Sequence, residues 1–319
     1  MMNDEEIIDS PVTKYSGVPP LFMLSMLGLI VVLCLLVGLG LVDGYGYLKG
    51  MNLSDSLASL TSDSGTSVRD FIRTNLLINH LTTFVIPGIV FSYFFYKKKW
   101  ASFLRIDKFP KVYNLLLGSM LILAAFPLAQ FVFWLNMKIP MPSFLVEMEE
   151  GTAEMVRNLL LVDQPHELWF NLFIIAVIPA IGEEFIFRGI LQKKLVEQLK
   201  NPHVAIWLAA LIFSAIHMQF QGFLSRMLLG GILGYLYHWT GNLWVPIFAH
   251  LINNAVQIVG QYFFQKGIID INMDSAIVEV NWPMTLIGLV VVGVMSYVMI
   301  RLNKERDIPL EADFQNRKT

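Results

Sequence analysis

Charged side chains are scarce in this chain. Asp, Glu, Lys and Arg make up 15% of its 319 residues, whereas a soluble domain carries roughly 25%. Apolar and aromatic residues contribute 55%, and the mean hydropathy is +0.58. A soluble globule needs more polar surface than this, and a disordered chain needs far fewer apolar residues. The composition therefore predicts a polytopic membrane protein.

Cysteine and excess positive charge are also lacking. Cys34 is the single cysteine, which excludes an internal disulfide framework and a cysteine-rich metal site. Lys and Arg number 23 against 25 Asp and Glu, so no basic excess is available to neutralise nucleic-acid phosphates. We therefore expect the lipid bilayer, and no nucleic acid, among the partners.

Long stretches without a charged residue indicate membrane-spanning helices, because a span needs about 20 apolar residues. Lipid also requires every backbone group to be paired within the protein, which favours helices over open strands. The uncharged run from Met227 to Gln265 is too long for one crossing, and the Thr240-Gly241-Asn242 turn divides it. The sequence thus predicts an all-α membrane bundle of about eight transmembrane helices. The predicted spans are 20–42, 73–96, 112–135, 167–192, 203–220, 223–239, 243–264 and 282–301.

The positions of Lys and Arg in the loops predict the orientation. Six of them lie within 97–111, which places that loop in the cytoplasm, and an even number of spans then puts both termini there. The acidic stretch 136–166 falls outside. The expected parts are a cytoplasmic N-terminal segment (1–19), a single transmembrane bundle (20–301) with its motif core at about 165–265, and a cytoplasmic tail (302–319).

Three predicted spans carry polar groups that lipid disfavours. An ionisable group at membrane depth is costly, so by default it marks a functional site that faces the bundle interior. A rise of about 1.5 Å per residue places these groups about 10–20 Å from the ends of their helices, where they can meet in one layer. The groups are Glu183, Glu184 and Arg188 in the fourth span, His217 in the fifth, and His250 and Asn254 in the seventh.

The spacing in the fourth span suggests separate roles for its two carboxylates. Glu184 and Arg188 are four residues apart on one helix face and can form an ion pair. Glu183 lies about 100° around the helix and is left to face the site. Together with His217 it makes a carboxylate–imidazole pair suited to taking a proton from water.

The polar groups of the seventh span are suited to a second role. His250 and Asn254 lie one turn apart and can both donate hydrogen bonds to a developing oxyanion. The whole set would suit a hydrolase that attacks an amide with activated water. A histidine within a membrane helix is more often a packing partner, which is the interpretation for His80, His203 and His238. The co-occurrence of polar groups in three spans favours a site.

These residues also form three motifs that resemble a known family. Residues 183–188 (EEFIFR) match an EExxxR motif, residues 213–217 (FSAIH) match FxxxH, and residues 250–254 (HLINN) match HxxxN. In this order they resemble the CAAX protease and bacteriocin-processing (CPBP, or Abi) family of intramembrane proteases. The resemblance covers about residues 165–265.

The resemblance implies an eight-helix bundle whose cleft opens toward the cytosol, in the plasma (inner) membrane of a bacterium. It implies that Glu183 and His217 activate water, that His250 and Asn254 act as oxyanion partners, and that the substrate is a membrane-associated peptide or protein. Members are commonly labelled metalloproteases. Glu183, His217 and His250 could hold zinc with an open water position, but the HExxH zinc helix is absent, which favours chemistry without a metal.

Two other functions fit parts of this pattern. A non-catalytic membrane scaffold or immunity-type partner protein could keep the same fold and motifs. A proton-coupled transporter could use membrane Glu and His as a relay, although the internal repeats usual in transporters are not apparent in the sequence.

Overall fold

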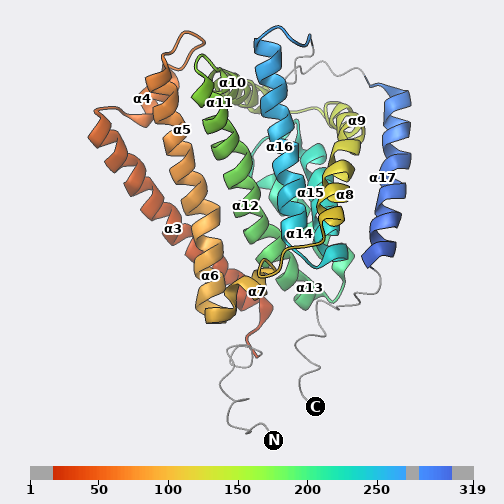
Figure 1. Ribbon diagram of the computed structural model, residues 1–319. Helices are drawn as coiled ribbons and strands as arrows, with labels where there is room; N and C mark the ends of the chain where they lie inside the picture. The colour runs from red at the N-terminus through yellow and green to blue at the C-terminus, as the bar shows by residue number, and fades with distance from the viewer. Residues whose placement is uncertain (1–16, 271–279, 304–319) are drawn as a thin grey trace, which may run out of the picture.

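The computed structural model describes residues 17–270 and 280–303, and every regular element within those ranges is a helix (Figure 1). The predicted all-α fold is therefore confirmed. The predicted cytoplasmic ends, apart from residues 17–19 and 302–303, lie outside the described residues.

All eight predicted spans coincide with helical stretches. Two of these stretches contain π-helical segments, in which the backbone bonds reach one residue further than in an α-helix. The stretches, in chain order, are α3 (Pro20–Lys49); α5 (Thr66–His80) with η1 (Leu81–Val85) and α6 (Ile86–Tyr96); α8 (Val112–Ala124) with α9 (Phe126–Asn136); α11 (Pro165–Asn171) with η3 (Leu172–Val177), α12 (Ile178–Glu184), η4 (Phe185–Gln192) and α13 (Lys193–Leu199); α14 (Pro202–Ala215); α15 (Phe223–Thr240); α16 (Trp244–Gln265); and α17 (Trp282–Asn303).

Within the described residues, five helices are long and apolar enough to cross a membrane. The predicted break at Gly241 is confirmed, because this residue ends α15 in the left-handed conformation with a φ of 58°. The fifth predicted span is shorter than expected, since α14 ends at Ala215. The five candidate spans are Pro20–Lys49, Thr66–Leu104, Val112–Asn136, Pro165–Leu199 and Trp282–Asn303.

Shorter helices occupy the connections between these stretches. They are α4 (Leu53–Ala58), the 3-10 turn η2 (Lys97–Lys99), α7 (Trp100–Leu104) and α10 (Ser143–Leu160). The predicted outer loop 136–166 thus contains an 18-residue helix, α10. The sequence of α10 is amphipathic, with charged residues between its apolar ones. It therefore contains no long apolar run that would predict a helix of the membrane-spanning kind.

The helices at the edges of the bundle are exposed, and those in its middle are buried. Figure 1 shows α3 and α17 at opposite edges, with α12 and α16 between them. In the most apolar 18-residue part of α3 and of α17, only 17% of the residues are buried. In the corresponding part of Pro165–Leu199, 61% of the residues are buried. Apolar side chains on the edge helices therefore face the surroundings, and the helix with the first motif lies in the middle of the protein.

Two glycines bring the second and fourth helical stretches into close contact. A Cβ on Gly182 would lie 2.8 Å from the Cβ of Phe84, and a Cβ on Gly88 would lie 2.9 Å from the Cβ of Phe185. Small residues at helix crossings let membrane helices approach each other closely. This packing positions the backbone immediately before Glu183.

A buried ionic cluster joins α5 to the start of α11. The Glu167 Oε1 atom accepts hydrogen bonds from Arg69 Nε at 3.0 Å and from Arg73 Nη1 at 2.7 Å, and all three side chains are fully buried. Glu167 Oε2 accepts from the backbone N–H groups of Asp163 and Gln164 at 2.8 and 2.9 Å. One carboxylate thus contacts two buried guanidinium groups and caps the start of α11. Asp163 and Asp70 supply further negative charge to Arg69 and Arg73.

Candidate active site

The first motif forms an ion pair inside the bundle. Glu184, the last residue of α12, accepts a hydrogen bond through Oε1 from Arg188 Nη1 at 2.6 Å, and both side chains are buried. Arg188 Nη2 also donates to the Gly230 carbonyl of α15 at 2.9 Å, and the guanidinium lies 5.0 Å from the centre of the Phe213 ring. The predicted pairing of Glu184 with Arg188 is confirmed.

The third motif extends this pair into a chain of three groups. His250 on α16 places its Nδ1 atom 2.8 Å from Glu184 Oε1. The Glu184 carboxylate, paired with Arg188, can only accept, so His250 Nδ1 donates to it. The other ring nitrogen, Nε2, then lies 3.8 Å from Glu183 Oε2. The chain Arg188–Glu184–His250 therefore orients an imidazole nitrogen toward Glu183.

Glu183 differs from its neighbour in having few polar contacts. Glu183 is 5% exposed, and its carboxylate accepts no hydrogen bond from any residue in the described part of the chain. Burying a carboxylate without hydrogen-bond donors costs free energy, unless a water molecule or a ligand supplies the missing hydrogen bonds. The free oxygens of Glu183 are consequently available to a ligand or a water molecule.

His217 follows the end of α14 rather than lying within a helix. The prediction of a helix over 203–220 was wrong here, because Met218 adopts the left-handed conformation with a φ of 52° and the chain turns. His217 Nδ1 lies 2.7 Å from the Phe213 carbonyl. A carbonyl can only accept, so Nδ1 donates and Nε2 is left with its lone pair.

The two imidazoles both lie near one aromatic ring. The Phe213 ring centre is 4.9 Å from that of His217 and 6.2 Å from that of His250. Among the described residues, no hydrogen bond or ion pair joins His217 to Glu183, the partner predicted for it. Glu183 is closer to His250, and its pairing with His217 remains a prediction.

Asn254 lies one turn after His250 but is held by other groups. Its Nδ2 donates to the Ile175 carbonyl of η3 at 3.3 Å, and its Oδ1 accepts from Asn253 Nδ2 at 3.0 Å. An amide carries two N–H hydrogens, so one donor is still available. The two predicted oxyanion donors therefore share a helix, although each already has a partner in this arrangement.

The three candidate zinc ligands do not form a coordination set. His250 Nδ1 is engaged by Glu184, and its Nε2 approaches Glu183 only to 3.8 Å. Over residues 17–270 and 280–303, no group of three His, Cys, Asp or Glu side chains is placed to hold a metal ion. Glu183, His217 and His250 as arranged here do not fit the close tetrahedral geometry that zinc requires.

Two residues that sequence reasoning missed hold the turn after His217. Glu149 on α10 accepts hydrogen bonds from the backbone N–H groups of Phe220 and Gln221. Asn136 at the end of α9 donates to the Phe220 carbonyl at 2.8 Å and accepts from the Leu224 N–H at 2.9 Å. No motif marks these residues, because they lie more than 70 positions away from the turn that they support.

Comparison with known proteins identifies the region that carries the motifs. Residues 165–256 match a family described as type II CAAX prenyl endopeptidase, Rce1-like. No solved structure matches the chain.

Curated relatives align over stretches of similar length. The uncharacterized protein YpbD of Bacillus subtilis is 38% identical over 96 residues, which cover 29% of this chain and 43% of YpbD. The putative membrane peptidase YdiL of Bacillus subtilis is 34% identical over 86 residues, or 27% and 35% of the two chains. The membrane-embedded CAAX protease MroQ of Staphylococcus aureus is 27% identical over 95 residues, or 28% and 38%.

The similarity is regional, since the chain spans less than half the length of the curated relatives it matches. The matched residues nevertheless include all three motifs and all six candidate site residues. Over residues 165–256 this membrane protein is therefore similar to the Rce1-like group of CAAX-protease-type membrane proteins.

Proposed function

We propose that the chain is an intramembrane endopeptidase that hydrolyses a peptide bond with an activated water. The observation that carries this proposal is the Glu183 carboxylate, which is buried and accepts no hydrogen bond from a described residue. It lies beside an imidazole that Glu184 and Arg188 hold in place. A carboxylate with free oxygens in a protected site is a suitable general base.

In this mechanism Glu183 and His217 prepare the water. Glu183 takes one proton from the water, and the lone pair on His217 Nε2 accepts a hydrogen bond from the other. The water oxygen forms a bond to the peptide carbonyl carbon. When the carbon–nitrogen bond breaks, the proton on Glu183 passes to the leaving amine, and the carboxylate is restored.

His250 and Asn254 act on the oxygen that becomes negative. The free donor of the Asn254 amide is one hydrogen-bond partner, and His250 Nε2 is the other when that nitrogen is protonated. The Glu184 carboxylate at Nδ1 stabilises the positive charge on the ring in that form. Fixed donors directed at a developing oxyanion commonly account for a large part of an enzyme's rate.

The substrate in this proposal is a membrane-associated peptide or protein. The relative MroQ is named a membrane-embedded CAAX protease, which supports a CAAX-type or related peptide as substrate. The bacterial source of the three relatives supports the plasma membrane as the location. The basic residues at 97–111 support a cleft that faces the cytosol.

The reaction as proposed does not require a metal. Zinc is the alternative. Glu183 and His250 Nε2 would then be two of the ligands, with His250 Nδ1 still held by Glu184, and His217 would have to turn toward them to supply the third. Dialysis of the purified protein against a chelator is expected to leave cleavage unchanged, measured alongside the zinc content by elemental analysis. Loss of activity with a chelator and its recovery with added zinc would favour the metalloprotease mechanism instead.

Replacing His217 tests the proposed function itself. The His217→Ala variant removes the acceptor that orients the water and is expected to lower cleavage by about 10²-fold or more. Membranes that contain the wild type or the variant are incubated, and newly formed peptide termini are quantified by mass spectrometry. His166→Ala is the matched control, because this imidazole is 61% exposed and lies outside the three motifs. Equal sets of termini in all samples would overturn the assignment.

A further inference from the structure

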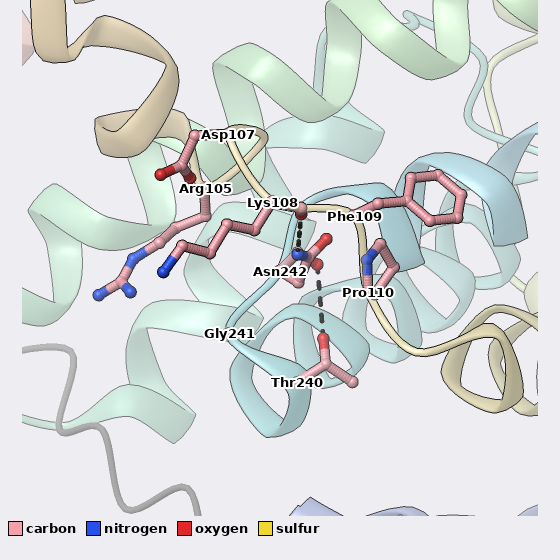
Figure 2. A pocket seen from close by; sticks show the side chains of 8 residues that line it. All are labelled: Arg105, Asp107, Lys108, Phe109, Pro110, Thr240, Gly241 and Asn242. Atoms are coloured by element: carbon pink, nitrogen blue, oxygen red, sulfur yellow. Dashed lines mark hydrogen bonds between the residues drawn. The ribbon is translucent and has the colours of Figure 1, made fainter.

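A pocket outside the three motifs lies between two turns of the chain. It has a volume of about 330 Å³ and is formed by the segment after α7 and the turn between α15 and α16 (Figure 2). Its walls include Arg105, Lys108 and Phe109 from the first segment and Asn242 from the second. None of the six candidate catalytic residues lines it, so it requires a separate explanation.

Hydrogen bonds to three backbone carbonyls hold the walls of this pocket together. Asn242 Nδ2 donates to the Lys108 carbonyl at 2.7 Å, as Figure 2 shows, and Leu243 N–H donates to the Arg105 carbonyl at 3.2 Å. The indole of Trp244 donates to the Ile106 carbonyl at 3.1 Å. The polar backbone of the segment is thereby directed at the turn, and the pocket is formed before any ligand binds.

The charged side chains that line the pocket are Arg105, Lys108 and Asp107, two basic and one acidic. Figure 2 shows the Arg105 and Lys108 side chains extending to the same side of the pocket, with Phe109 on the other side. The one carboxylate in this stretch, Asp107, accepts a hydrogen bond from Ser102 Oγ at 2.6 Å. Residues 97–111 contain six basic residues and one acidic residue. This charge balance favours an anionic ligand.

The position of the pocket relates it to the membrane surface. The segment connects the candidate spans Thr66–Leu104 and Val112–Asn136, so it lies where both leave the bilayer. Phe109 is 63% exposed, and its ring lies 6.2 Å from that of Trp244 and 6.3 Å from that of Phe248. Aromatic rings next to basic side chains are typical of the region where lipid headgroups meet the acyl chains.

We propose that this pocket binds the phosphate of an anionic phospholipid headgroup. Arg105 and Lys108 contact the phosphate oxygens, and Phe109 packs against the glycerol and the first carbons of the acyl chains. A free phosphate ion has the same charge chemistry but would gain nothing from the exposed aromatic ring. The basic residues of 97–111 outside the pocket attract anionic lipids to the surface, and the pocket selects one of them.

Native mass spectrometry of the detergent-solubilised full chain tests this proposal. Phosphatidylglycerol is the anionic probe, phosphatidylcholine is the zwitterionic control, and inorganic phosphate is the soluble control. The first phosphatidylglycerol is expected to bind about tenfold or more tightly than phosphatidylcholine, and the Arg105→Gln/Lys108→Gln variant is expected to lose that preference. Inorganic phosphate is expected not to displace the bound lipid.

A charge-matched variant separates a pocket from a diffuse basic surface. Lys98→Gln/Lys99→Gln removes the same charge from exposed positions of the same segment and is expected to retain the first lipid. Lys108→Gln alone, at an exposed position, provides a second test if the double variant folds poorly. Equal losses in both double variants, equal binding of the two lipids, or displacement by inorganic phosphate would each overturn the proposal.

Discussion

Replacing Glu183 by Gln is expected to lower peptide-bond cleavage by about 10²–10⁴-fold, the usual contribution of a general base. The amide has nearly the same shape as the carboxylate but cannot accept the proton of the attacking water. The fold should be unaffected, because Glu183 accepts no hydrogen bond from any residue that the structure describes. Removing a buried charge with no close partner should also leave the melting temperature unchanged or raise it.

The neighbouring carboxylate provides the contrasting control. Glu184→Gln is the same chemical change one residue later, but it breaks the 2.6 Å ion pair and leaves the charge of Arg188 buried. This variant is expected to lower the melting temperature as well as the cleavage rate. Glu150→Gln, at an exposed position on α10, should change neither. If Glu183→Gln cleaved at the wild-type rate, Glu183 would not be the base.

Replacing Glu167 by Gln is expected to reduce the free energy of unfolding by about 3–5 kcal/mol, the cost of breaking a buried ion pair. The substitution leaves the charges of Arg69 and Arg73 without the carboxylate that both contact. It also replaces one of the acceptors that serve the start of α11. Equilibrium unfolding in mixed micelles, followed by circular dichroism, measures the effect.

The matched control removes the other carboxylate that contacts Arg73. Asp70 accepts from Arg73 Nη1 at 2.9 Å, but its side chain is 34% exposed. Water screens such a pair, so Asp70→Asn is expected to cost about 1 kcal/mol or less. Similar losses in the two variants would show that burial does not distinguish the two ion pairs.

The features that could be predicted from the sequence are local ones. The eight helical stretches follow from runs of apolar residues, and the end of α15 follows from the conformational freedom of Gly241. The pairing of Glu184 with Arg188 follows from their spacing on one helix. In each case the interacting groups lie within one turn or one segment of the chain.

The contacts between helices could not be predicted in this way. A π-helical turn adds a residue to the turn and so shifts the following side chains by about 100° relative to a regular α-helix. One such turn, η4, begins directly after Glu184, and a single sequence gives no sign of it. The approach of His250 to both carboxylates, and the end of α14 before His217, depend on how neighbouring helices are rotated and joined.

The hydrogen bonds that hold the turn after His217 affect how short a fragment of this protein could be while keeping that turn in place. The segment shared with other proteins ends at residue 256 and begins at residue 165, so it excludes both Glu149 and Asn136. Those two side chains satisfy the backbone of Phe220 and its neighbours. A fragment cut at the borders of sequence similarity would therefore lack the groups that position one of its own histidines. Residues 165–256 therefore do not contain all of the contacts that hold the turn after His217.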